Sequence, residues 1–298
     1  MDSFDRLNDS LAGFLNKEKV SAPEYNEAQM WEYVEKAQIS YSDNIRKPPA
    51  IMSLWQDGKQ IPIMTNGNFS LFKGQAKSRK TFGLSMIAAS LAYDIKIYET
   101  FIPNMKGKTT LFIDTEQSEY HVYRFVNSVV NLSGFDGQHP NFRALCLRPF
   151  ETSMRLKIVE FLIYNAQNLG YVIIDGIRDL IKDFNSLDES TMISDKLLRW
   201  TKEKNIHISV VLHENPSKDG TMNKARGHLG TELSNKAETI IGFEKNKEDK
   251  RQTIIRSDDT RGEEFEPIYF KIDQNEMGLF PVIVEKNVYV SSKEPDRF

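Results

Sequence analysis

The stretch Gly74-Gln75-Ala76-Lys77-Ser78-Arg79-Lys80-Thr81 decides which fold we expect for this chain. It matches the pattern G-x-x-x-x-G-K-[ST], except that Arg79 stands where the pattern has its second glycine. The apolar residues 69–73 precede it and a helical stretch follows it. In such a strand–loop–helix setting, backbone N–H groups bind phosphates. We expect Lys80 to reach the β- and γ-phosphates of ATP and the Thr81 hydroxyl to hold Mg²⁺.

The arginine in this loop is a departure from the pattern. It weakens the match, because its position often needs a backbone conformation that glycine adopts most easily. The strand–loop–helix setting nevertheless favours a nucleotide over a basic turn before a helix. We therefore predict that the whole loop binds the nucleotide, through Gly74, Gln75, Ala76, Lys77, Ser78, Arg79, Lys80 and Thr81.

Two apolar runs end in acidic residues, which such a loop needs as partners. Residues 171–175 end in Asp175, which we expect to hold Mg²⁺ through water. Residues 111–116 end in Asp114-Thr115-Glu116. Glu116 is the candidate general base that orients the attacking water, and Asp114 is the competing choice. All of these residues are expected at the carboxyl edge of one parallel sheet, where open α/β folds bind ligands.

The chain around the loop alternates between short apolar runs and longer amphipathic stretches. This alternation predicts an α/β fold with a mostly parallel sheet flanked by helices. The expected strands are 69–73, 109–114, 142–147, 171–175 and 206–212, and the expected helices are 80–93, 119–132, 152–168 and 189–204. The later runs 239–244, 252–256, 267–272 and 279–284 favour antiparallel strands at the C-terminal edge of the sheet.

The N-terminal region follows another pattern. Phe4, Leu7 and Leu11 recur at helical spacing and continue to Phe14 or Leu15, and a second helical stretch runs from residue 23 to about 39. We therefore predict a helical N-terminal arm over 1–48, with a possible role in oligomerisation. An ATPase domain is expected over 49–285 and a tail over 286–298.

Composition narrows the class of protein. Hydrophobic residues make up 40% of the 298 residues and charged residues 27%, which is typical of globular chains and excludes disorder throughout. The net charge of −3 excludes a polycation that coats nucleic acid. A single cysteine excludes an intrachain disulfide. Without a signal-peptide pattern or an apolar run long enough for a membrane, we predict a cytoplasmic protein with no membrane partner.

The order of these motifs resembles that of the RecA-like ATPases. It comprises the loop ending in Lys80-Thr81, then Phe-Ile-Asp-Thr-Glu at 112–116, Val-Ile-Ile-Asp at 172–175 and Val-Val-Leu-His at 210–213. Within that group it resembles the RepA- and DnaB-type hexameric helicases. Lys-Ser-Arg-Lys-Thr at 77–81 and Ala-Arg-Gly-His-Leu-Gly-Thr-Glu at 225–232 resemble a RepA-like subgroup of mobile genetic elements, in which arginine at the glycine position is tolerated. The resemblance covers about residues 50–273.

The resemblance implies further roles. Glu116 falls at the position of the catalytic glutamate, and His213 where the family senses the γ-phosphate with Gln or His. Arg261 aligns best with the arginine finger that reaches a neighbouring subunit's nucleotide, and Arg256 is second. Related helicases often have Lys two residues before the finger, whereas this chain has Asp259.

A polar segment after His213 corresponds to the loop that lines the central pore of related helicases and touches single-stranded nucleic acid. The nucleic-acid-binding residues implied there are Lys218, Lys224 and Arg226. Its Pro, Gly, Ser and Lys content fits an ordinary surface loop equally well. The resemblance also implies a homo-oligomer, for which the hexameric rings of the related helicases suggest a hexamer.

The sequence thus predicts an ATP- and Mg²⁺-dependent ring motor acting on nucleic acid, with DNA favoured over RNA. A replicative helicase or translocase of a mobile element is the leading function. Two alternatives stay open: an ATP-dependent switch or assembly factor without helicase activity, and a nucleotide-binding module that does not hydrolyse ATP.

Overall fold

The structure is a computed structural model, and it describes residues 26–214 and 227–286. The chain divides into two compact units, Met1–Lys47 and Pro48–Phe298. In the first unit, helix α2 (Glu27–Ala37) begins after Asn26, whose side chain accepts a hydrogen bond from the Gln29 N–H. The amphipathic helix expected around residues 4–15 lies outside the described residues.

The second unit is built on a large sheet with the strand order β12-β11-β10-β9-β3-β8-β7-β5-β6. The strands from β9 to β6 in this order are parallel, and β10, β11 and β12 continue the sheet in antiparallel fashion. Their bounds are β3 (Phe69–Gly74), β5 (Thr109–Asp114), β6 (Phe142–Cys146), β7 (Leu169–Asp175), β8 (His207–His213), β9 (Thr239–Lys245), β10 (Gln252–Thr260), β11 (Ile268–Asn275) and β12 (Gly278–Val284).

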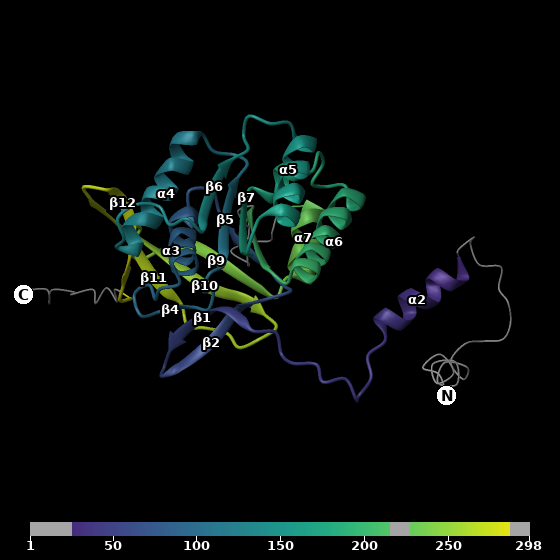
Figure 1. Cartoon of the computed structure of the whole chain (residues 1–298). Helices are drawn as coiled ribbons and strands as arrows, with labels where there is room; N and C mark the ends of the chain where they lie inside the picture. Colours follow the sequence, from purple (N-terminus) through teal and green to yellow (C-terminus); the bar gives the residue numbers. More distant parts are fainter. Residues whose placement is uncertain (1–25, 215–226, 287–298) are drawn as a thin grey trace, which may run out of the picture. The chain divides into compact units, whose positions relative to one another are not determined.

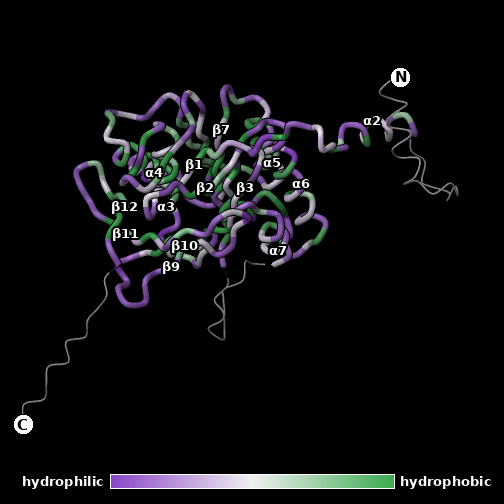
Figure 2. The backbone as a smooth tube through the Cα atoms, turned by 90° about the horizontal axis from the view of Figure 1, so that it is seen from below, coloured by the Kyte–Doolittle hydropathy of each residue, from purple (hydrophilic) through white to green (hydrophobic). Residues whose placement is uncertain are grey.

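Helices cover both faces of the parallel strands (Figure 1). On one face lie α3 (Lys80–Tyr93) and α4 (Glu119–Ser133), and on the other lie α5 (Thr152–Asn165), α6 (Leu187–Lys204) and α7 (Gly227–Lys236). Phe112 packs in the core beneath α3 and α4, while its neighbour Ile113 and the fully buried Trp200 belong to the opposite core. Burial on both faces explains why these strands are continuous apolar runs rather than alternating ones. Figure 2 shows the hydrophobic residues gathered in the interior of this unit.

A smaller antiparallel sheet flanks the large one, and two of its three strands precede β3 in the chain. It has the order β2-β1-β4, with β1 (Ala50–Gln56), β2 (Lys59–Thr65) and β4 (Phe101–Pro103). Asp57 and Gly58 make the turn between β1 and β2, both with positive φ, and Asp-Gly is a residue pair that favours such hairpins. The hairpin lies in a region for which the sequence analysis predicted no strands.

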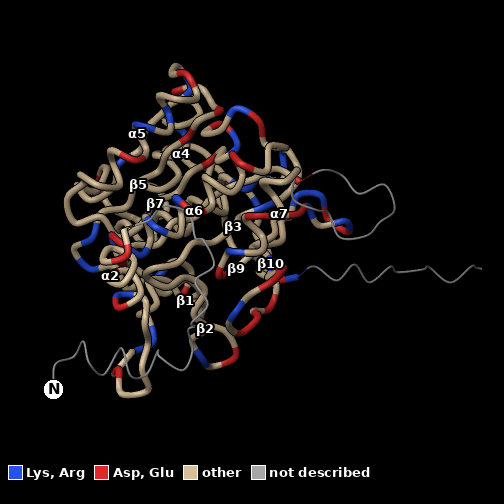
Figure 3. The backbone as a smooth tube through the Cα atoms, turned by 90° about the vertical axis from the view of Figure 1, so that its right-hand side faces the viewer, with Lys and Arg blue, Asp and Glu red and all other residues tan. Residues whose placement is uncertain are grey.

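The expected α/β fold with a mostly parallel sheet is confirmed, and most element boundaries agree within a few residues. One expectation is wrong in part: β9 is not antiparallel to its sheet neighbour β3 but parallel to it, with Ser70 opposite Thr239. The antiparallel extension therefore begins only at β10. Figure 3 shows Lys and Arg interspersed with Asp and Glu over the described chain, in keeping with the small net charge.

Candidate nucleotide site

The loop between β3 and α3 contains two residues in the left-handed backbone conformation. Lys77 and Arg79 both have positive φ, at 63° and 66°. Gly74 has no room for a side chain, because a Cβ there would lie 2.3 Å from the carbonyl oxygen of Phe243. The first glycine of the pattern is thus demanded by the close approach of β9, and the loop ends at the N-terminus of α3.

Arg79 occupies the position where the pattern has glycine, and it adopts the left-handed conformation with φ 66° and ψ 27°. For a residue other than glycine this conformation costs about 1–2 kcal/mol. Its side chain is anchored on β10 and the turn before it: Nη1 donates to the Arg251 carbonyl at 2.6 Å and lies 3.4 Å from Thr253 Oγ1. These bonds offset part of the cost and hold the arginine in place.

Lys80 is buried at the first position of α3. Its Nζ donates to the carbonyls of Gly74 at 2.8 Å and Gln75 at 3.0 Å, and it lies 3.2 Å from Nδ1 of His213. Burial lowers the pKa of Lys80, although nearby carboxylates oppose this effect. The ammonium group is therefore held at the base of the loop mainly by neutral partners.

His213 at the end of β8 connects this lysine to Glu116, whose Oε2 lies 3.3 Å from Nε2 of His213. Because an ionised carboxylate only accepts hydrogen bonds, Nε2 must donate to it, which leaves Nδ1 to accept from Lys80. The hydrogen bond from His213 is the main cause that lowers the pKa of Glu116. Three residues far apart in sequence thus form one polar chain.

The other two carboxylates at this edge have different surroundings. Asp114 is buried, and its Oδ1 accepts the N–H groups of Glu116 at 2.9 Å and Gln117 at 2.7 Å, so it shapes the turn that carries Glu116. Burial raises the pKa of Asp114. Asp175 lies opposite Asp114 in the pairing of β5 and β7. Burial first, and then the charges of Asp114 and Glu116, raise the pKa of Asp175 to about 7.

Most of these groups surround one cavity of about 470 Å³, which Asp114 does not line. The predicted residues that line it are Lys77, Ser78, Arg79, Lys80, Thr81, Glu116, Asp175 and His213. The site also includes residues that the sequence analysis missed, namely Phe82, Gln117, His121, Arg124, Phe125 and Ser128. Most of these follow at helical spacing on one face of α4, a signal that was present once the helix after the acidic strand had been assigned.

A hydroxyl, a carboxylate and the phosphates of a nucleotide make an oxygen donor set, which Mg²⁺ prefers. Thr81 and Asp175 line the cavity and would supply the protein's share, and a cation there would oppose the burial and the neighbouring acidic charges that raise the pKa of Asp175. Within residues 26–214 and 227–286, no group of three or more His, Cys, Asp or Glu side chains is placed to hold a metal by itself. The residues present therefore fit a metal that binds together with phosphates.

The two finger candidates lie apart from this cavity. Strand β10 is antiparallel to β9, so Thr253 lies opposite Lys245 and Thr260 lies opposite Thr239 at the other end. Arg261 therefore lies near the amino edge of the parallel strands, where its Nη2 lies 3.3 Å from the Lys236 carbonyl oxygen.

Arg256 instead belongs to a cluster of charged side chains on β3, β9 and β10 and directly after β8. We call it the buried charge cluster, because the side chains at its centre, Lys73, Glu214 and Asp258, are buried. It consists of Lys73, Glu214, Glu244, Arg256 and Asp258. Arg256 forms ion pairs with Glu244 and Asp258, and Lys73 Nζ lies 2.9 Å from Asp258 Oδ2 and 3.6 Å from Glu214 Oε1. The guanidinium group of Arg256 is therefore already paired within its own chain.

The remaining predicted residues are Lys218, Lys224 and Arg226, and they lie outside the described residues. Gly74, Gln75 and Ala76 form the start of the loop without lining the cavity. None of the described helices is long and apolar enough to cross a membrane.

One comparison with known proteins, that with solved structures, supports the fold. No protein-family model and no curated protein sequence matches the chain. Among solved structures, the chain is similar to the crystal structure of the RadB recombinase, with a TM-score of 0.50 and 17% identity. The match covers 74% of this chain and 92% of the other. The fold is therefore the RecA-like α/β fold, as expected.

Proposed function

We propose that this chain binds ATP with Mg²⁺ and hydrolyses the bond to the γ-phosphate. The observation that carries the proposal is the polar chain Lys80–His213–Glu116 at the mouth of the phosphate loop. It places a buried cation beside a general-base candidate, and both face the same cavity. A terminal phosphate with an attacking water next to it needs this pair of groups.

The roles of the residues follow from their surroundings. Lys80 moves from the carbonyls of its own loop to the phosphate oxygens, where it balances negative charge. The Thr81 hydroxyl and, through water, the Asp175 carboxylate would hold Mg²⁺, which would supply further charge neutralisation on the β- and γ-phosphates. The loop N–H groups and the N-terminus of α3 hold the phosphates in place.

Glu116 orients the water that attacks the γ-phosphorus in line, and it accepts a proton from that water as the bond to ADP breaks. Asp114 is the weaker candidate because its carboxylate already accepts two backbone N–H groups. His213 touches both Lys80 and Glu116, so a γ-phosphate that attracts Lys80 changes the partners of the histidine. That arrangement supports His213 as the sensor of the γ-phosphate.

We further propose that the ATPase is a ring of identical subunits acting on single-stranded nucleic acid, as a RepA-like helicase or translocase of a mobile element. The position of Arg261 supports this proposal, because a finger for a neighbour's nucleotide has to lie away from its own cavity. Lys218, Lys224 and Arg226 are the proposed contacts to the nucleic acid. Residues 1–48 would then contribute to oligomerisation, next to an ATPase domain over 49–285 and a tail over 286–298.

The deciding experiment measures ATP turnover with and without single-stranded DNA. Lys80→Ala and Glu116→Gln should each remove turnover, whereas Glu119→Gln, an exposed acid three residues further on, should keep it. Equal turnover in all four proteins would contradict the assigned site. ATP binding without turnover in the wild type would favour the non-hydrolysing module. Turnover without DNA stimulation or strand separation would favour the switch.

The proposed finger in trans has its own test. Arg261→Ala and Lys80→Ala subunits should each be inactive alone. Mixed together, they should recover part of the turnover, because an intact Lys80 site then receives Arg261 from its neighbour. Light scattering with ATP gives the oligomer mass. No recovery from a mixture that forms oligomers would contradict the role of Arg261.

A further inference from the structure

Thr115, the residue directly before Glu116, ties the loop after β5 to the loop after β7. It is 1% exposed, and its Oγ1 lies 2.9 Å from the Gly176 carbonyl oxygen and 3.2 Å from Oδ2 of Asp179. Its N–H also donates to the carbonyl of Asp175 at 3.1 Å. The backbone that carries Glu116 is therefore bound on one side to the segment that follows the candidate metal ligand.

The loops after β5 and β7 pack too closely for a side chain at Gly176. Gly176 has a φ of 97°, and a Cβ there would lie 2.2 Å from Oγ1 of Thr115 and 2.9 Å from Cγ of Glu116. Only a glycine allows the Thr115 hydroxyl and the stem of the glutamate to lie this close. A shift of the hydroxyl is therefore transmitted to the position of the glutamate.

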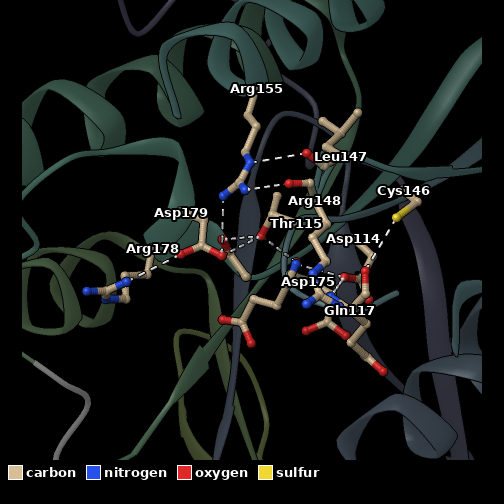
Figure 4. A network of polar contacts seen from close by, with 12 residues as sticks. Asp114, Thr115, Gln117, Cys146, Leu147, Arg148, Arg155, Asp175, Arg178 and Asp179 are labelled. Atoms are coloured by element: carbon tan, nitrogen blue, oxygen red, sulfur yellow. Dashed lines mark hydrogen bonds and ion pairs between the residues drawn. The ribbon is translucent and has the colours of Figure 1, made fainter. Parts of the chain in front are cut away.

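Asp179 and Arg155 extend the network to a third loop (Figure 4). Asp179 lies in the 3₁₀ helix η1 (Ile177–Leu180), and its Oδ2 is 3.7 Å from Nη1 of Arg155 on α5. Arg155 also donates from Nε to the Leu147 carbonyl at 3.2 Å and from Nη2 to the Arg148 carbonyl at 3.0 Å. The guanidinium thus joins the loop after β6 to the loops after β5 and β7.

We propose that Thr115 and Asp179, braced by Arg155, are positioning residues for ATP hydrolysis. None of the three lines the cavity, so they act through Glu116 by fixing where its carboxylate meets the attacking water. The inference rests on the proposed function, since it assigns a second set of residues to the same reaction. A misplacement of about 1 Å in a reacting group can lower the rate roughly 10²-fold.

The test compares Thr115→Val with Thr115→Ser. Valine keeps the branched shape and removes the hydroxyl, whereas serine keeps the hydroxyl and removes the methyl group. Thr115→Val should lower kcat for ATP about tenfold to a hundredfold, and Thr115→Ser should stay near the wild type. The KM for ATP and the Kd for ADP should change by less than about twofold, because the phosphate loop is untouched.

A double variant separates positioning from a merely structural role. In the Glu116→Gln background, Thr115→Val should lower single-turnover hydrolysis no further, because the residue it positions is already disabled. Should Thr115→Val not fold, the folded Asp179→Asn variant decides by the same kcat and KM comparison. Asparagine keeps the shape and an acceptor oxygen but loses the charge that pairs with Arg155.

Three results would overturn the inference: a Thr115→Val kcat equal to that of Thr115→Ser, a KM that rises as much as kcat falls, or an equal loss in the Glu116→Gln background. If Asp179→Asn has to decide, a wild-type kcat overturns it too. Each of these results is compatible with the proposed ATPase function, provided that the wild type hydrolyses ATP and Glu116→Gln retains only slow, single-turnover hydrolysis. A wild type without turnover would instead contradict the proposed function itself.

Discussion

Lys73 and Lys80 lie at the two ends of the phosphate loop and are buried to the same degree, with 7% and 6% of their surface exposed. Their surroundings are opposite. Lys73 meets two carboxylates of the buried charge cluster. Lys80 meets the carbonyls of Gly74 and Gln75 and the ring of His213. Among the described residues, no carboxylate forms an ion pair with Lys80.

The difference separates a structural charge from a binding charge. A buried charge destabilises the protein unless an opposite charge pairs with it. A buried lysine held by neutral groups therefore still attracts an anion strongly, whereas the charge of a lysine in an ion pair is already compensated. Burial lowers the pKa of Lys80, which is the sign of this incomplete compensation. The phosphates of ATP are anions of the size and charge to compensate the ammonium group of Lys80, and the cavity lies beside that group.

The largest effects are expected from the same substitution at the two lysines. Lys80→Met should lower ATP turnover on the order of 10³-fold, as for the loss of one preorganised charge-stabilising donor, with little change in the free energy of unfolding. Lys73→Met should instead cost about 3–5 kcal/mol of stability, because it removes the cation from buried ion pairs with Asp258 and Glu214. Urea denaturation and steady-state turnover measure both. If the two variants lose the same amount of stability, the comparison between the lysines fails.

The second prediction extends the comparison to the carboxyl group of Asp175. Because the pKa of Asp175 is raised from 3.8 to about 7, the folded protein holds this proton more tightly than the unfolded chain does. The free energy of unfolding should therefore fall as the pH rises from about 4 to about 7, and the full loss should remain above pH 7. Asp175→Asn removes that loss, so Tm at pH 8 should rise, by roughly 2–4 °C for each kcal/mol regained.

The same variant should lose turnover, since an amide replaces the carboxylate proposed for Mg²⁺. Calorimetry at pH 8 and pH 4 provides the control, because the stability difference should shrink as the wild-type carboxyl becomes protonated in both states. A lower Tm for Asp175→Asn at pH 8 would show that the charge is compensated within the protein, as it is for Lys73.

How much the sequence could predict depends on how local each signal is. Strands such as β5 and β7 are continuous apolar runs, and the amphipathic α4 follows at helical spacing, so their residues alone predict them. The hairpin of β1 and β2 was missed because its apolar residues are interrupted by Ser53 and Pro62, although Asp57-Gly58 marked the turn. The direction of β9 is not contained in its own residues, because parallel and antiparallel strands share the same period.

The same reasoning applies to the site. The phosphate loop and Asp175 are motifs that follow single strands, so they were predictable. The polar chain joins Glu116 to a residue 97 positions away, and Lys80 to the same residue across 133 positions. The buried charge cluster and the tie between Thr115 and Asp179 likewise exist only once the strand order has brought the loops together. The residues that make these contacts follow no regular spacing in the sequence, so the sequence alone could not predict them.

The smallest effect is expected at Arg79, between the two lysines. Arg79→Gly removes the strain of the left-handed conformation, about 1–2 kcal/mol, and loses hydrogen bonds worth about 0.5–1.5 kcal/mol each. The two changes nearly cancel, so turnover should stay within about threefold of the wild type, since the loop keeps the same path. Arg79→Val should do worse in both turnover and Tm, because a branched Cβ tolerates a φ of 66° poorly. If glycine and valine behave alike, the left-handed backbone at this position is not what the loop needs, and the arginine then acts through its contact with Arg251 alone.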